Sequence, residues 1–196
     1  MESPFIFGRV ATGNNFTNRV TEKLRLTNNF KHKINTIIIS PRRLGKSSLV
    51  HQTALELANN KKTKFCFIDL FKVRNEEEFY QLFVKSLLRS TAGKVEEWLS
   101  IIKLFLGHIL PKVSFNITGQ DTIDISFSVE NIKKDWEDIL DLPEKIAIKK
   151  NIQIIICLDE FQNISYFNDP TGFQKRLRAV WQHHSHTNYC RSEERR

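Results

Sequence analysis

Residues 34–49 read INTIIISPRRLGKSSL, and this stretch decides the fold. The short, β-branched apolar run over 34–39 predicts a buried strand that Ser40-Pro41 ends, and residues 45–59 favour a helix. The loop between them matches the pattern GxxxxGK(S/T) at every fixed position except the first, where Ser40 replaces Gly. The stretch therefore predicts an anion-binding loop that joins a buried strand to a helix N-terminus.

The residue types of this loop suit the phosphates of a nucleotide. Gly45 lets the backbone approach closely, Lys46 places a positive charge on the β- and γ-phosphates, and the Ser47 hydroxyl coordinates Mg²⁺. Because backbone N–H groups wrap the anion, we expect the whole loop to bind nucleotide: Ser40, Pro41, Arg42, Arg43, Leu44, Gly45, Lys46, Ser47 and Ser48. For the two arginines, a role as solvated loop charges is the open alternative.

An acidic pair follows the most apolar predicted strand, over 152–158. We expect Asp159 to hold Mg²⁺ together with Ser47, and Glu160 to orient or deprotonate the attacking water. Lys46 and Glu160 are therefore the expected catalytic residues. The alternative is a strand that ends in two solvated acids. A Glu directly after the Asp favours ATP hydrolysis over phosphoryl transfer to a small metabolite.

With these motifs, the sequence resembles the prokaryotic, archaeal-type AAA ATPases, a P-loop family of the AAA+/STAND kind. The loop is similar to that family's SPRRxGKTSL loop, in which Ser at the first position is ordinary, and residues 158–162, LDEFQ, are similar to its DEFQ Walker B. The stretch from Phe7 to Arg19 looks like its N-terminal element. The resemblance implies ATP and Mg²⁺ as cofactors, a nucleotide-dependent conformational change, and Gly8 and Arg19 close to the adenine.

The order of predicted elements indicates an α/β fold, a P-loop NTPase core with a central parallel sheet. Strands are expected at 34–39, 63–70, 152–158 and from 187, and helices at 18–32, 45–59, 76–90, 94–108, 130–149 and 171–184. Two alternating runs predict an inserted β-hairpin near 112–129. Pro143 is expected to interrupt the helix over 130–149. We assign 1–190 to one ATPase core and 191–196 to a charged tail.

The resemblance also predicts how the sheet ends. In the family, strand 34–39 lies between the fourth and fifth strands, and a polar sensor residue, the fifth strand and a helical lid follow the segment similar to 181–184. Here the sequence turns to RSEERR partway into the fourth strand, as in a truncated or frameshifted member. We therefore expect a sheet incomplete at the C-terminus, with strand 34–39 unpaired along at least one side and prone to form homo-oligomers through that edge. Weak ATP binding and slow or absent hydrolysis follow from this.

Composition narrows the function classes. The chain has 196 residues, a formal net charge of +8 and 40% hydrophobic residues, which indicates a globular protein. No apolar run approaches the ~18 residues of a spanning helix, and the N-terminus lacks the pattern of a signal peptide. We therefore expect no membrane association and a cytoplasmic location. Three cysteines without a CxxC pair favour small buried thiols in a reducing compartment.

The positive charge gathers in the first third of the chain, where residues 1–64 hold 12 basic and 3 acidic residues. This distribution suits an anionic partner such as a nucleotide or a nucleic acid. The basic runs 31–33 and 61–64 are candidates for nucleic-acid contact, with solvated surface charge as the alternative. Two other classes stay open beside the ATPase: a nucleic-acid-binding or interaction module with a vestigial nucleotide site, and another P-loop enzyme such as a kinase.

Overall fold

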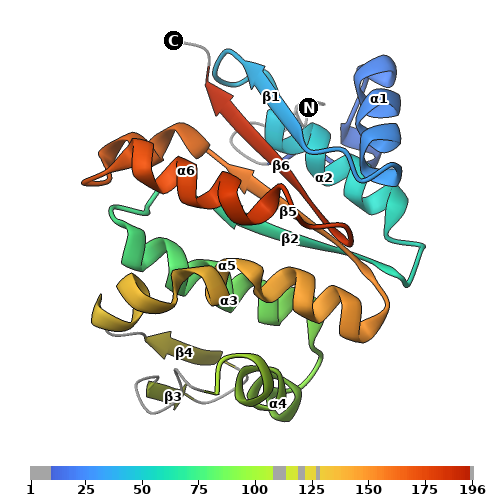
Figure 1. Ribbon diagram of the computed structural model, residues 1–196. Helices are drawn as coiled ribbons and strands as arrows, with labels where there is room; N and C mark the ends of the chain where they lie inside the picture. The colour runs from blue at the N-terminus through green and yellow to red at the C-terminus, as the bar shows by residue number, and fades with distance from the viewer. Residues whose placement is uncertain (1–9, 108–113, 119–121, 127–128, 195–196) are drawn as a thin grey trace.

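A computed structural model of the protein describes residues 10–107, 114–118, 122–126 and 129–194 (Figure 1). The strands are β1 (Thr36–Ser40), β2 (Thr63–Asp69), β3 (Ser114–Thr118), β4 (Thr122–Ser126), β5 (Gln153–Asp159) and β6 (Thr187–Glu194). The helices are α1 (Val20–Lys31), α2 (Lys46–Leu57), α3 (Glu76–Thr91), α4 (Val95–Phe105), α5 (Val129–Lys150) and α6 (Pro170–Trp181). Two short 3-10 helices are η1 (Gly13–Asn15) and η3 (Phe161–Tyr166). This order confirms the predicted α/β class.

Four parallel strands form the main sheet, in the order β1-β6-β5-β2. β5 lies inside the sheet, and its apolar run is buried, as expected for a strand covered on both faces. β1 lies at one edge of the sheet as the described residues form it. Within the described residues, this edge position confirms the expected unpaired side of strand 34–39 and differs from the interior position that the strand has in the family.

β6 differs from its prediction. The sequence predicted a strand cut short near Cys190 and a charged tail from Arg191, but β6 continues to Glu194. Residues 190–194 pair with 36–40, so the charged segment supplies nearly all of the ladder of β1. The charges find partners at the strand end, because Arg191 lies 4.7 Å over the Phe161 ring and Glu194 pairs with Arg42 at 3.5 Å.

Helices cover both faces of the sheet (Figure 1). α1 and α2 cover one face over a small core of Leu26, Phe30, Leu49, Val50, Ile155, Cys157 and Cys190. α3, α5 and α6 cover the other face over a larger core, whose aromatic members include Phe79, Tyr80, Phe83 and Phe173. Each such side chain stabilises the fold by roughly 1.5–3 kcal/mol through burial. The three cysteines are free and buried in these cores, as expected.

Local sequence explains most helix ends. Asn75 caps α3 by accepting a hydrogen bond from the Glu78 N–H, and Asp169 caps α6, with Pro170 at the first helical position. Pro143 does not interrupt α5, whose non-helical dihedrals fall at Asp135 (φ −115°, ψ 17°). β3 and β4 pair antiparallel, which confirms the inserted hairpin. Among the described helices, none is long and apolar enough to cross a membrane.

Candidate nucleotide-binding site

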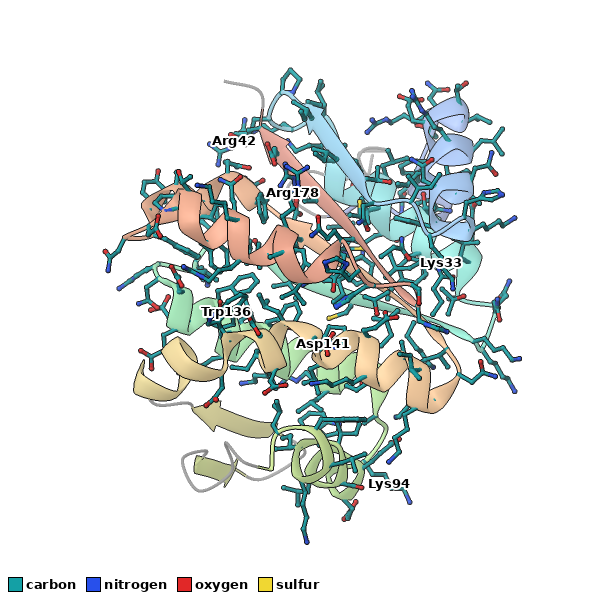
Figure 2. The ribbon with its side chains drawn as sticks, viewed as in Figure 1. Lys33, Arg42, Lys94, Trp136, Asp141 and Arg178 are labelled. Atoms are coloured by element: carbon teal, nitrogen blue, oxygen red, sulfur yellow. The ribbon has the colours of Figure 1, made fainter. Side chains whose placement is uncertain are left out.

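The carboxyl ends of the parallel strands bring the predicted site residues together. β1 ends at Ser40 and leads into the loop before α2, and β5 ends at Asp159. β6 lies between these strands and reaches the same edge of the sheet. Arg42 marks this end of the molecule in Figure 2. Open α/β sheets bind their ligands at this edge.

The loop has the backbone shape of an anion cradle. Arg43 and Gly45 have positive φ angles of 63° and 69°, and Lys46 starts α2 directly afterwards. A Cβ at Gly45 would have its nearest neighbour 3.8 Å away, so the left-handed φ, and not a lack of space, favours glycine there. The first N–H groups of a helix have no helical partners, and those of α2 are therefore donors for a phosphate.

Lys46 is buried, with 5% of its surface exposed. Its Nζ donates to the carbonyl oxygens of Ser40 at 3.2 Å and Pro41 at 3.4 Å. Within the part of the chain that the structure describes, no carboxylate pairs with this ammonium group. A buried cation without a counter-charge is costly, so an anion bound in the loop would stabilise it.

Ser47 and Asp159 meet as the motif spacing predicts, and the Ser47 hydroxyl donates to Asp159 Oδ2. The Ser192 hydroxyl of β6 donates to the other carboxylate oxygen, Oδ1. Hydroxyl and carboxylate oxygens suit Mg²⁺, which also takes phosphate and water oxygens. Among the described residues, no three His, Cys, Asp or Glu side chains gather around a common metal position. The Ser47 hydroxyl and the Asp159 carboxylate would supply part of a Mg²⁺ coordination shell, which phosphate and water oxygens would complete.

Glu160 follows Asp159 in a left-handed backbone conformation, with φ 54°. Its N–H donates to Asp159 Oδ1 at 3.1 Å and to the Ser192 hydroxyl at 3.3 Å. Its carboxylate accepts a hydrogen bond from Gln162 Nε2 at 2.5 Å, and Gln162 Oε1 accepts from the Glu194 N–H at 3.2 Å. A non-glycine residue at positive φ costs on the order of 1 kcal/mol. Surrounding hydrogen bonds therefore fix both the backbone and the carboxylate of Glu160.

Arg19 supports the loop from its N-terminal side. Its Nη1 donates to the carbonyl oxygens of Leu44 at 2.8 Å and Gly45 at 3.1 Å. The segment before it docks on α2, because the Ala11 N–H donates to the Ser48 hydroxyl at 3.0 Å. Arg19 and Ser48 thus lie at the loop, while Gly8 lies outside the described residues.

The loop tip is open to solvent. Arg42 exposes 70% of its side chain although it pairs with Glu194. Arg43 and Leu44 are also exposed. The two arginines are therefore accessible to a nucleotide or to a partner, and solvation remains the alternative for Arg43.

A cavity of about 250 Å³ lies beside the Ser47–Asp159 pair, lined by α2 and by the ends of β2, β5 and β6. His51 lines it and stacks on Phe67, with ring centroids 3.9 Å apart. Burial lowers the pKa of His51, and the nearby Asp159 charge opposes this shift. The imidazole is therefore mainly neutral at pH 7.

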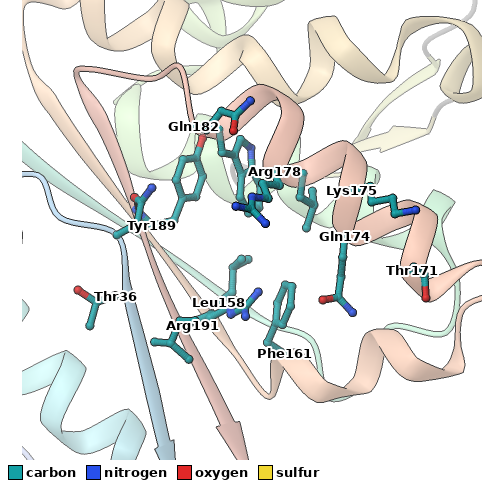
Figure 3. Close-up of a pocket in the computed structure, with 14 residues that line it drawn as sticks. Thr36, Leu158, Phe161, Thr171, Gln174, Lys175, Arg178, Gln182, Tyr189 and Arg191 are labelled. Atoms are coloured by element: carbon teal, nitrogen blue, oxygen red, sulfur yellow. Dashed lines mark hydrogen bonds between the residues drawn. The ribbon is translucent and has the colours of Figure 1, made fainter.

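A second hollow, of about 670 Å³, lies on the sheet face that α6 covers (Figure 3). Thr36 and Ile37 of β1, Tyr189 and Arg191 of β6, and Arg178 of α6 line it. Neither Lys46 nor Ser47 belongs to its lining, so we do not assign the nucleotide there.

Sequence reasoning missed Ser192, which it placed in a charged tail. The resemblance implied that the polar residue of this strand would be absent, yet Ser192 contacts Asp159 and the backbone of Glu160. In the observed register Leu158 pairs with Arg191, so Ser192 follows opposite Asp159. Ser192 could have been found from the sequence by extending the strand that begins at 187 through the charged residues that follow Cys190. Gln162 belongs to the LDEFQ motif, but the motif alone does not predict its contact to Glu160.

No protein-family model and no curated protein matches the chain. Solved structures do match it. The Walker-type ATPase PABY2304 of Pyrococcus abyssi is 16% identical, with a TM-score of 0.54 over 97% of this chain and 49% of that one. The Aeropyrum pernix ORC1 protein, solved in complex with DNA, is 11% identical, with a TM-score of 0.57 over 92% of this chain and 40% of that one. The Aeropyrum pernix ORC2 protein, solved as ADPNP-ADP complexes, is 12% identical, with a TM-score of 0.52 over 93% and 43%.

These similarities define the class of fold. The chain has an α/β fold similar to that of these ATPase and ORC proteins, and it spans less than half the length of each of these structures. At 11–16% identity, the likeness concerns the fold alone.

Proposed function

We propose that this chain binds ATP with Mg²⁺ at the loop Ser40–Ser48 and hydrolyses the nucleotide. The sequence predicted weak binding and slow or absent hydrolysis, because it ended the last strand near Cys190. The continuation of β6 to Glu194, with Ser192 against Asp159, supports hydrolysis instead.

The observation that carries the proposal is the hydrogen bond from Ser47, at the start of α2, to Asp159, at the end of β5. Ser47 follows the buried Lys46, which has no ion-pair partner among the described residues. The structural neighbours include a Walker-type ATPase and a protein solved as ADPNP-ADP complexes, which supports the same assignment.

Binding rests on the loop and the start of α2. The N–H groups of the first turn and the Lys46 ammonium hold the β- and γ-phosphates, because both present positive charge at one helix end. Arg19 keeps the loop in shape through the Leu44 and Gly45 carbonyls. Ser47 and Asp159 hold Mg²⁺, which when bound neutralises charge that develops on the phosphate oxygens.

Hydrolysis rests on Glu160. Its carboxylate lies one residue after Asp159 and is oriented by Gln162, which suits it to orient a water or accept its proton. Ser192 positions Asp159 and the Glu160 backbone at the same time. The strain of the left-handed φ at Glu160 fits a site held by its surroundings.

Coupling to a conformational change has a physical route in these contacts. Asp159 bonds to α2 through Ser47 and to β6 through Ser192. Arg42 at the loop tip pairs with Glu194 at the end of β6. A change in the loop on nucleotide binding therefore reaches the end of β6 directly.

Phosphate release from ATP tests the proposal. We expect Mg²⁺-dependent turnover in the wild-type chain, its loss in Lys46→Ala and Glu160→Gln, and no change in Lys72→Ala, an exposed lysine outside the site. Absence of both ATP binding and turnover in the folded wild type would overturn the proposal. Binding without turnover would support the binding part of the proposal and contradict the hydrolysis part.

A further inference from the structure

The loops that precede the four parallel strands lie together at the amino-terminal ends of these strands, which form one edge of the sheet. Parallel strands place their amino ends together, and here the loops 32–35, 182–186, 151–152 and 58–62 lead into β1, β6, β5 and β2. This edge lies opposite the candidate nucleotide site, as the positions of Lys33 and Arg42 show (Figure 2). The nucleotide site uses none of these loops.

Hydrogen bonds join these loops into one surface. Lys33 Nζ donates to the Ser185 carbonyl at 2.7 Å. The Gln153 N–H donates to the Lys62 carbonyl at 2.7 Å, and Gln153 Nε2 donates to the Phe30 carbonyl at 2.7 Å. Two basic runs that are distant in the sequence are therefore held on the same edge by a common residue, Gln153.

The charge of this edge has one sign. The stretches 30–35, 57–64, 149–153 and 183–187 contain no Asp or Glu. We define the lysine edge as Lys31, Lys33, Lys61, Lys62 and Lys64. Lys31, Lys61 and Lys62 are exposed, and none of them forms an ion pair within the described part of the chain.

The acids that approach this edge are already engaged. Glu144 is buried and accepts from the N–H groups of Ser185, His186 and Thr187. Asp141 pairs with His184 and Lys145. Glu56, at the end of α2, pairs with Lys23 at 2.6 Å. The positive field of the lysine edge is therefore left without a facing counter-charge among these groups.

We propose that the lysine edge binds the phosphate backbone of a nucleic acid duplex, independently of the nucleotide site. The four loops span three strand spacings of about 4.8 Å, or roughly 14 Å. Successive phosphates of one DNA strand rise about 3.4 Å, so the edge covers about four phosphate steps. Ile34 is the large apolar side chain exposed in these described loops. A membrane-binding surface would present several apolar or aromatic side chains, so a duplex fits better.

We expect this surface to bind a duplex through the charge of its phosphates and not through its base sequence. Lysine ammonium groups act as point charges on phosphates, and the four loops carry no Phe, Trp or Tyr for base stacking. Each neutralised phosphate contributes a slope of about −0.9 to the dependence of log K on log salt. Three exposed lysines therefore account for a slope of about −2.7.

Fluorescence anisotropy with a labelled mixed-sequence DNA duplex, without nucleotide and at about 50 mM salt, tests the proposal. The edge variant is Lys31→Gln, Lys61→Gln and Lys62→Gln together. The matched control removes three exposed lysines elsewhere, by Lys72→Gln, Lys94→Gln and Lys103→Gln. We expect the edge variant to bind at least tenfold more weakly with a salt slope smaller by about 2–3, and the control to bind within about threefold of the wild type.

Three results would overturn the proposal: a wild-type chain that does not bind the duplex, an equal loss in both variants, or binding to vesicles containing anionic lipid but not to DNA. ATP binding is measured on the same proteins and should be unchanged in the edge variant. The test of the lysine edge is therefore independent of the test of the nucleotide site.

Discussion

Ser47 and Asp159 are 112 positions apart in the sequence and share a hydrogen bond at the carboxyl edge of the sheet. Ser47 lies in the first turn of α2, and Asp159 is the last residue of β5. Their contact joins the two motifs that the sequence predicted to act together. Because β6 lies between β1 and β5, the contact depends on how that strand ends as well as on the motifs themselves.

Asp159→Ala should remove the Mg²⁺ dependence of ATP binding, because the carboxylate is the charged protein ligand expected for the metal. Titrations of ATP with and without Mg²⁺ measure the effect. Ser192→Ala is the informative companion, since it removes only the hydroxyl that holds Asp159 Oδ1. It should weaken the Mg²⁺ effect without abolishing it. A full Mg²⁺ effect in Asp159→Ala would place the metal elsewhere.

Glu160→Gln should keep ATP binding and lose turnover by about 10²–10⁴-fold, the usual contribution of a positioned acid or base. The amide keeps the size of the side chain but accepts no proton. Single-turnover phosphate release, combined with a separate binding titration, distinguishes these steps. Turnover unchanged from the wild type would assign the base to another group.

Glu144 should stabilise the fold in a pH-dependent way. Burial alone would raise its pKa, but hydrogen bonds from Ser185 and His186 outweigh burial and lower the pKa to about 2, from 4.5. The folded chain therefore holds the ionised carboxylate more strongly than the unfolded chain. The stabilisation, at most about 3 kcal/mol, is complete above about pH 4.5 and is lost as the pH falls toward 2.

Urea unfolding of the wild type and Glu144→Gln at several pH values measures this contribution. The difference in the free energy of unfolding should be largest near pH 7 and shrink below about pH 4.5. Glu137→Gln, an exposed site on the same helix, serves as the control. A difference that stays constant down to pH 3 would contradict the assignment.

Ile39→Lys should reduce self-association. Ile39 lies on the edge strand β1 and is 59% exposed, and exposed apolar edge strands promote edge-to-edge pairing, which a lysine opposes. Light scattering over a range of protein concentrations should show a shift toward the monomer. Leu104→Lys changes an equally apolar, 53% exposed side chain on α4 and should leave association unchanged. If both variants showed the same shift toward the monomer, the shift would result from the added net charge and not from a change at the edge strand.

The core of the fold and the two motifs could be predicted from local sequence. The apolar run before Ser40 and the run before Asp159 are short and bounded by clear breaks, so their strands and the loop to Lys46 were predictable. Their meeting at one sheet edge follows from parallel topology. The hairpin was predictable from its alternating pattern.

The end of β6 could not be predicted in this way. The charged residues at this strand end have little strand propensity. Arg191 pairs with both β1 and β5, whereas Glu193 and Glu194 pair with β1 alone, so these neighbouring strands extend β6. Cross-contacts then satisfy the charges of these residues, as in the Arg42–Glu194 pair. Ser192, which carries the site's third contact to Asp159, was missed for this reason.

Isothermal titration of ATP·Mg²⁺ into the wild-type chain and Lys46→Ala tests the central claim most directly. The wild type should bind one nucleotide, and ligand at about 100 times Kd should stabilise the fold by about 2.7 kcal/mol. Lys46→Ala, confirmed as folded by circular dichroism, should show neither the heat of binding nor the stabilisation, while Lys72→Ala should match the wild type. Equal binding by wild type and Lys46→Ala would contradict the assignment of the loop as the nucleotide site.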